Sequence, residues 1–162
     1  MPKVGTVLGI GVDIVNSVRF ERLLTAKSTS FGTRLSKRIL HPEHELPLFQ
    51  QMHSQRQAQY LTGSWAAKEA LFKTLDLNSQ KEFNFNQWYR FHDSNGKPFI
   101  WNDRYKLSDE EFHLSISHDD SLVIDASIYC VPFKTIFELK KLCLEFLKYI
   151  IYIIPLNFRR QL

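Results

Sequence analysis

The side chains best placed for chemistry are one carboxylate in an apolar strand and a carboxylate with an ammonium group on a helix. Asp13 lies in the apolar stretch 7–15 (VLGIGVDIV), which is typical of a buried strand. An ionised carboxylate is costly to bury unless it is paired or binds a metal ion. Asp13 could therefore bind a cation, or it could accept the free amides of a helix that starts near Ser17 or Val18.

Glu69 and Lys73 stand four residues apart in the segment 54–75, whose apolar residues recur at helical spacing, so the two share one helix face. An exposed pair of this kind contributes only a few tenths of a kcal/mol and requires no function. A carboxylate that holds Mg²⁺ beside an ammonium that neutralises a phosphate oxygen would instead form a diphosphate site. Small residues in the same segment would leave room for a ligand or another backbone: Ala66, Ala67 and Ala70.

His118 follows the strand-like segment 112–117 and precedes Asp119 and Asp120. A single histidine in such a place is usually a loop residue with a satisfied hydrogen bond. Metal binding by these three side chains is the alternative, although no second cluster in the sequence supports it.

The elements that must position these residues follow one another in an informative order. One buried strand precedes helical segments that continue to residue 75, and strand-like segments then follow at 83–92, 97–101, 112–117 and 121–129. Asn95-Gly96 predicts a hairpin with a type I′ turn between the first two of these. The order predicts an α+β fold, with a small antiparallel sheet packed against helices, rather than a doubly wound parallel sheet.

Composition excludes several classes of protein. A chain of 162 residues with 44% hydrophobic and 23% charged residues is typical of one globular core. The net charge of +4 comes without a dense Lys/Arg tract, so no nucleic-acid partner is expected. Cys130 and Cys143 do not form a disulfide framework, and no secretory signal precedes the first strand, so a secreted protein is not expected.

The segment 133–162 differs from the rest and is predicted to be an extra C-terminal helix that extends a domain at 1–132. Apolar residues fall at helical spacing, between charged ones, at Ile136, Leu139, Cys143, Phe146, Ile150 and Ile154. The uninterrupted apolar run 149–154 is far shorter than the roughly 18 residues of a membrane span. Packing on its own domain or a neighbouring subunit, and peripheral membrane contact, both remain as interpretations.

Four blocks in one order carry a family resemblance: GIGVDIVNSVRF (9–20), GSWAAKEALFKTL (63–75), NGKPF (95–99) and HLSISHDDSLVIDASI (113–128). Together they resemble the small holo-acyl-carrier-protein synthases, which are 4′-phosphopantetheinyl transferases. Each block alone is weak, but the ordered set spans the chain from about residue 8 to 129.

The resemblance implies an activity and a metal. The expected reaction moves 4′-phosphopantetheine from coenzyme A to a serine of an acyl carrier protein, releases adenosine 3′,5′-bisphosphate and supports fatty acid biosynthesis. Asp13 and Glu69 match the two Mg²⁺ carboxylates of the family, and Lys73 matches the lysine that contacts the diphosphate. Glu69 is the first choice for the general base and Asp13 the second.

The resemblance also implies binding residues, an assembly and a location. Lys68, His118 and the turn Asn95-Gly96-Lys97-Pro98 match residues that lie along coenzyme A. Arg19 and Arg38 match basic residues that engage the acidic carrier protein. A homotrimer with its active sites between subunits is expected. The aromatic-rich, tail-extended chain favours a mitochondrial location although no presequence is visible, and the cytoplasm is the alternative.

Two departures from the family pattern leave other functions open. Ser64 stands where the family usually has an arginine before the aromatic residue, and Lys68 or Arg56 could supply the missing phosphate contact. The segment 133–162 has no counterpart in the minimal bacterial enzymes. The alternatives are a homologue that binds carrier protein with little or no catalysis, and a membrane-associated interaction protein that acts through its C-terminal helix.

Overall fold

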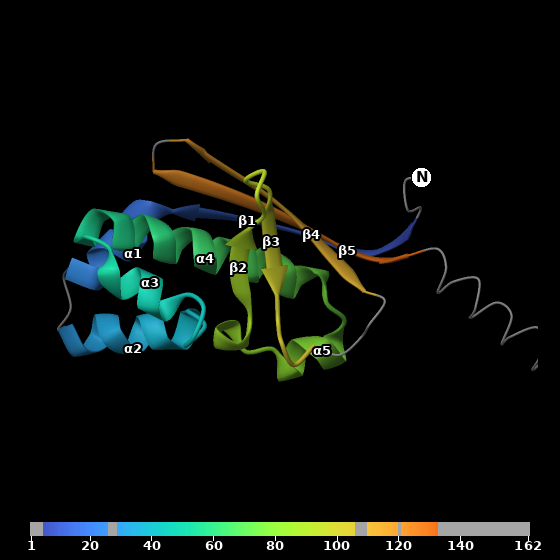
Figure 1. Ribbon diagram of the computed structural model, residues 1–162, viewed down its shortest axis with the longest axis horizontal. Coiled ribbons are helices and arrows are strands. Elements are labelled where there is room, and N and C mark those ends of the chain that lie inside the picture. The colour runs from blue at the N-terminus through green and yellow to red at the C-terminus, as the bar shows by residue number, and fades with distance from the viewer. Residues whose placement is uncertain (1–4, 26–28, 106–109, 120, 133–162) are drawn as a thin grey trace, which may run out of the picture.

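The computed structural model describes residues 5–25, 29–105, 110–119 and 121–132 (Figure 1). The predicted helix at 133–162, and with it the division of the chain at residue 132, lies outside these residues. The elements in chain order are β1 (Gly5–Asn16), α1 (Ser17–Thr25), α2 (Thr29–Ile39), α3 (Leu46–Gln51), α4 (Ser54–Thr74), α5 (Leu77–Glu82), the 3₁₀ turn η1 (Phe85–Gln87), β2 (Tyr89–His92), β3 (Pro98–Trp101), β4 (Glu111–Asp119) and β5 (Leu122–Pro132).

The three long strands form one antiparallel sheet in the order β1-β5-β4, and β2 with β3 forms a separate hairpin. β1 therefore pairs with β5, and the helices of the described residues lie between these two strands in sequence. Figure 1 shows α4 running along one face of the sheet, with the hairpin beside it. This arrangement confirms the predicted α+β fold with a small antiparallel sheet.

Two apolar clusters flank α4. One joins α4 to α1 and α2 around Phe20, Leu40 and Leu61. The other joins α4 to the hairpin and β4 around Leu71 and Trp88. Because α4 is enclosed on several sides, even its Thr62 and Ser64 are fully buried. None of the helices among the described residues is long and apolar enough to cross a bilayer.

The aromatic segment before β2 differs from the prediction. The sequence predicts a strand over 83–92, but the first part of this segment forms the turn after α5 and the 3₁₀ turn η1, and β2 begins only at Tyr89. Phe83 stacks on Trp88, and Phe85 stacks on Trp65 of α4. The alternating aromatic side chains therefore pack on the core although their backbone forms a turn. Ring packing outweighs the local preference for a strand here.

The turn between β2 and β3 also differs from the prediction. Gly96 N donates to Asp93 O at 3.0 Å, so the turn centres on Ser94 and Asn95, and Gly96 follows with a positive φ of 79°. A type I′ turn centred on Asn95-Gly96 would have the Lys97 amide donating to Ser94 O. The Asp93 carboxylate instead accepts the amides of Asn95 and Lys97 at 2.9 and 2.8 Å. The hairpin therefore closes through an Asp-capped turn followed by a glycine bulge.

Candidate active site

Two glycines allow β1 to lie directly on α4. A Cβ on Gly9 would lie 2.1 Å from Thr74 O, and a Cβ on Gly11 would lie 2.0 Å from Ala70 O. Any other residue would push the strand away from the helix at these two points. The close crossing brings Asp13, two residues beyond Gly11 on the same strand face, to the end of α4 that carries Glu69 and Lys73.

Asp13 and Lys73 are in direct contact. Lys73 Nζ donates to Asp13 Oδ1 at 2.8 Å and to the backbone carbonyl of Val12 at 2.9 Å. The Asp13 side chain is 13% exposed and that of Lys73 is 41% exposed. The second oxygen, Asp13 Oδ2, is buried and has no hydrogen-bond partner in the part of the chain that the structure describes. An acceptor of this kind, left unpaired beside a charge, is suited to bind a cation.

Glu69 completes the group. Burial raises the pKa of the Glu69 carboxyl above its usual value, the nearby Asp13 raises it further, and Lys73 acts in the opposite direction. Repulsion between the two carboxylates therefore disfavours having both of them ionised side by side. A divalent cation would relieve this repulsion and satisfy Asp13 Oδ2, so Asp13 and Glu69 fit a magnesium-type site with oxygen ligands.

Lys68 lies elsewhere, and the expectation that it contacts the ligand needs correction. Its side chain is fully buried, and Nζ donates to the Glu45 carboxylate and, at 2.7 Å, to Ile39 O. Burial lowers the pKa of Lys68 to about 8, although Glu45 holds it up. Lys68 lies on the buried face of α4, whereas its neighbour Glu69 is partly exposed. The Lys68 ammonium is therefore occupied by Glu45 and Ile39 O and does not reach a surface ligand.

Arg90 lies beside Gly63, next to Ser64, the position at which the family usually has an arginine. Ser64 is fully buried, and its Oγ has no partner among the described residues. Next to it, a Cβ on Gly63 would lie 3.0 Å from Arg90 Nη1. The Arg90 guanidinium also lies over the ring of Tyr60, 5.6 Å from its centroid. Sequence reasoning considered Lys68 and Arg56 here and missed Arg90, because only the fold brings β2 against this part of α4.

His118 and the hairpin turn are not brought into contact with Asp13. His118 pairs with Val123, which pairs with Val15, so β5 separates His118 from β1. Two strand spacings make this roughly 10 Å across the sheet. Residues 95–97 are exposed at the tip of the β2–β3 hairpin. His118 and the hairpin turn can bind the same ligand as Asp13 only if that ligand is long or if a second copy of the chain supplies them.

The predicted carrier-binding residues lie on α1 and α2. Arg19 is exposed on α1, and its guanidinium lies 5.8 Å from the centroid of the Phe20 ring. Arg38 is exposed in the last turn of α2. Both helices, which pack on each other, present further exposed basic side chains: Arg22, Arg34 and Lys37.

An α+β domain that gathers two carboxylates and a lysine at one strand–helix crossing has the chemistry of an enzyme that acts on a diphosphate. The sequence model of the 4′-phosphopantetheinyl transferase superfamily matches residues 9–127. The chain belongs to this superfamily.

Curated relatives and solved structures agree with this assignment. The chain is 38% identical over 112 residues to the holo-[acyl-carrier-protein] synthase of Geobacillus kaustophilus, covering 69% of this chain and 80% of the relative. A second relative of that name, from Geobacillus sp. (strain WCH70), is 33% identical over 118 residues, or 73% of this chain and 92% of the relative.

Two crystal structures of holo-[acyl-carrier-protein] synthases share the fold. The enzyme from Neisseria meningitidis superposes with a TM-score of 0.62 at 28% identity, covering 76% of this chain and 98% of its own. The Bacillus anthracis enzyme, solved in complex with CoA (3′,5′-ADP), gives a TM-score of 0.61 at 25% identity, covering 79% and 99%.

Proposed function

We infer that this chain is a holo-[acyl-carrier-protein] synthase, which transfers 4′-phosphopantetheine from coenzyme A to a serine of an acyl carrier protein. The observation that carries this conclusion is the convergence of Asp13, Glu69 and Lys73, with Asp13 Oδ2 left unpaired. Relatives with this activity in their names, and a neighbouring structure in complex with coenzyme A, support the inference.

We propose that the reaction depends on Mg²⁺ held by Asp13 and Glu69. The ion, when bound, would neutralise the diphosphate so that an uncharged hydroxyl can approach the phosphorus. The serine oxygen forms a bond to the phosphorus that carries pantetheine, and the bond from this phosphorus to the leaving 3′,5′-ADP breaks.

The protein's own residues then have separate tasks. Lys73 lies half-exposed beside Asp13, so its ammonium can donate to a phosphate oxygen while it keeps the Val12 carbonyl as an anchor. Glu69 accepts the proton of the serine hydroxyl, because it is the carboxylate beside Asp13 and Lys73 where the hydroxyl must approach. The proton then passes to solvent.

Arg90 is proposed to supply the phosphate contact that Ser64 cannot make. Its guanidinium has no ion-pair partner among the described residues, and Gly63 leaves room for it on α4. Gly63 lies six residues from Glu69, which is about 9 Å along a helix and within the length of coenzyme A. Arg90→Gln should therefore raise KM for coenzyme A at nearly unchanged kcat, and an unchanged KM would reject this role.

A homotrimer is proposed for the assembly. The face of the sheet turned away from α4 leaves β1 side chains uncovered, with Ile10 66%, Val12 53% and Ile14 60% exposed. Ile128 of β5, the neighbour of Ile10, is 38% exposed. Burying this face between copies would also let His118 of one copy approach the site of another. Light scattering of the full chain tests the proposal, since a monomer at micromolar concentration would contradict it.

The proposed carrier-binding surface is the basic face of α1 and α2. Acidic carrier protein would be attracted to Arg19 and Arg38 before the serine reaches the site. Arg19→Glu should weaken carrier binding with little effect on coenzyme A binding, and equal losses in both would count against the division of roles. A mitochondrial location is also proposed, with the cytoplasm as the alternative, and cell fractionation decides between them.

The experiment that tests the function is the mass of a carrier protein after incubation with coenzyme A, Mg²⁺ and the full chain. Addition of one phosphopantetheine group supports the proposal. Binding of the carrier protein without a mass change would favour the non-transferring homologue, for which the buried Ser64 in place of arginine is the main argument.

A further inference from the structure

A second group of metal-binding side chains lies outside the active site, where the loop between α2 and α3 meets the end of β3. His41 and His44 belong to this loop, and Asp103 follows β3. One ligand atom from each of the three lies within 4.8 Å of the others. His44 Nε2 is 3.4 Å from Asp103 Oδ2. Two ligands of a tetrahedral zinc ion with bonds of roughly 2.0–2.1 Å are separated by about the same distance.

Tyr89 holds two of these side chains in position. Its hydroxyl donates to Asp103 Oδ1 at 3.0 Å, which leaves Oδ2 directed to His44. Its ring stacks on the His44 imidazole with 3.9 Å between centroids. Ligands of protein-bound metals are commonly oriented by such neighbours, which fix the carboxylate and the ring before the metal binds.

The loop that carries the histidines is itself anchored in the core. Glu45 is fully buried, forms the ion pair with Lys68 and accepts the backbone amide of His41 at 2.9 Å. Its other oxygen accepts the amide of Arg90 at 3.2 Å. His41 and His44 therefore project from a backbone that is held on both sides by one buried carboxylate.

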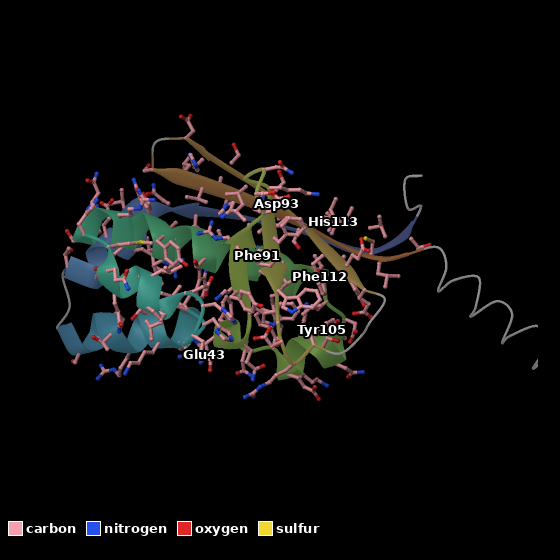
Figure 2. All side chains as sticks on the ribbon, viewed as in Figure 1. Glu43, Phe91, Asp93, Tyr105, Phe112 and His113 are labelled. Atoms are coloured by element: carbon pink, nitrogen blue, oxygen red, sulfur yellow. The ribbon has the colours of Figure 1, made fainter. Side chains whose placement is uncertain are left out.

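A hollow of about 350 Å³ lies beside two of the three side chains, His41 and Asp103, and is also lined by Glu43, Asn86 and Arg104. Figure 2 labels Glu43 near this end of the hairpin. The hollow leaves space for water or a small ligand next to a bound ion. Two imidazoles with one carboxylate and an open position form a donor set typical of Zn²⁺ and neighbouring transition metals, not of Mg²⁺.

We propose that His41, His44 and Asp103 bind one transition-metal ion of the Zn²⁺ class, with a further coordination position open to the hollow. The site is distinct from Asp13 and Glu69 in both place and chemistry. A bound ion would join the α2–α3 loop to the end of β3, two segments that are about sixty residues apart in sequence.

His41 sets the affinity of the site. Its Nδ1 accepts the backbone amides of Glu43 and His44 at 3.2 and 3.3 Å. The neutral ring then carries its proton on Nε2, so binding through Nε2 requires the proton to move and these two long hydrogen bonds to be lost. We therefore expect Zn²⁺ and Co²⁺ to bind more weakly here than at a preformed structural zinc site.

The test is a titration of the full chain with Co²⁺ in excess Mg²⁺, followed by visible absorption and calorimetry. One equivalent should bind and give the intense absorption of a low-coordinate cobalt ion. His44→Gln and Asp103→Asn should each weaken binding at least tenfold, and Tyr89→Phe about tenfold. His92→Gln, at an exposed histidine on the hairpin, is the matched control and should bind as the wild type does.

Folding and transfer activity give independent readouts. The His44 and Asp103 side chains are 43% and 54% exposed, so the metal-free variants should melt within a few degrees of the wild type. Their Mg²⁺-dependent transfer should stay within about twofold of the wild type, since neither residue lies at the Asp13–Glu69 site. The proposal is overturned if the wild type binds Co²⁺ no more tightly than the His44→Gln/Asp103→Asn double variant.

Discussion

Lys68 and Glu69 are adjacent in sequence, yet α4 directs them to different surroundings. Lys68 reaches the buried Glu45, whereas Glu69 lies at the crossing with β1 beside Asp13. The same dipeptide therefore supports the core with its first residue and the chemistry with its second. The effects of replacing either residue on stability can be predicted without knowing the substrate.

Replacing Lys68 by methionine should destabilise the protein strongly. The change leaves the Glu45 carboxylate buried without its cation, which typically costs about 3–5 kcal/mol of unfolding free energy. Chemical denaturation measures the loss. Lys97→Met, at an exposed position of the hairpin turn, is the control and should change stability by less than about 0.5 kcal/mol. Adding Glu45→Gln to Lys68→Met should restore part of the lost unfolding free energy. Equal stabilities of Lys68→Met and Lys97→Met would refute the account.

Glu69 should reduce the stability of the metal-free protein at neutral pH. Its pKa in the folded state is raised above the unfolded value, so the folded state holds its proton to higher pH. This contribution to stability is present at pH below the unfolded pKa and is lost as pH rises through the folded pKa. Metal-free Glu69→Gln should therefore melt a few degrees above the wild type at pH 7.

The difference between Glu69→Gln and the wild type should disappear as pH falls below the usual glutamate range. Added Mg²⁺ should raise the melting temperature of the wild type but not that of Glu69→Gln. Thermal melts at several pH values measure both effects. A variant less stable than the wild type at pH 7 would show that Glu69 is a structural ion-pair residue instead.

At the scale of elements, the crossing of β1 and α4 decides whether the site exists. Asp13 is positioned by a strand, Glu69 and Lys73 by a helix, and two glycines set the distance between them. The sequence predicted the strand from its apolar, β-branched run and the helix from its periodicity, and the family resemblance singled out the three side chains. The sequence-based reading did not identify the contact of Gly11 with Ala70 O, which depends on how the elements pack.

Gly11→Ala should damage both stability and transfer. Its methyl group would overlap the Ala70 carbonyl, and relief of this overlap moves β1 away from α4 at a cost of about 1–3 kcal/mol. Transfer should fall more than tenfold, because Asp13 moves with the strand. Gly32→Ala is the matched control: its nearest neighbour, Leu24 Cδ2, is 3.5 Å away, and α2 should gain roughly 0.5–1 kcal/mol. Full transfer by Gly11→Ala at normal stability would contradict the crossing argument.

Long-range pairings explain what the sequence could not predict about the site. Lys68 shares a motif with Glu69, but its partner Glu45 is distant in sequence and no local pattern links them. Arg90 was missed because it reaches Gly63 only through the hairpin. The aromatics before β2 alternate as in a strand, yet they pack on Trp65 and Trp88 from a turn. In each case a tertiary contact overrides a local signal.

At the scale of the whole molecule, the two faces of the sheet have different roles. One face is covered by α4 and carries Asp13, and the other leaves Ile10, Val12 and Ile14 exposed on β1. His118 lies on the edge strand β4, away from Asp13 within one chain. Assembly of copies through the exposed face would cover the apolar side chains of β1. It would also bring β4 of one copy, with His118, toward Asp13 of another.

The most direct test of the central claim is the intact mass of an acyl carrier protein after incubation with coenzyme A, Mg²⁺ and either the wild-type chain or Glu69→Gln. The account predicts that the wild type adds one phosphopantetheine group. Glu69→Gln should fold and bind carrier protein but lose transfer by at least a thousandfold. No mass change with the wild type, or near-normal transfer by folded Glu69→Gln, would contradict the claim that Asp13, Glu69 and Lys73 form the active site of a phosphopantetheinyl transferase.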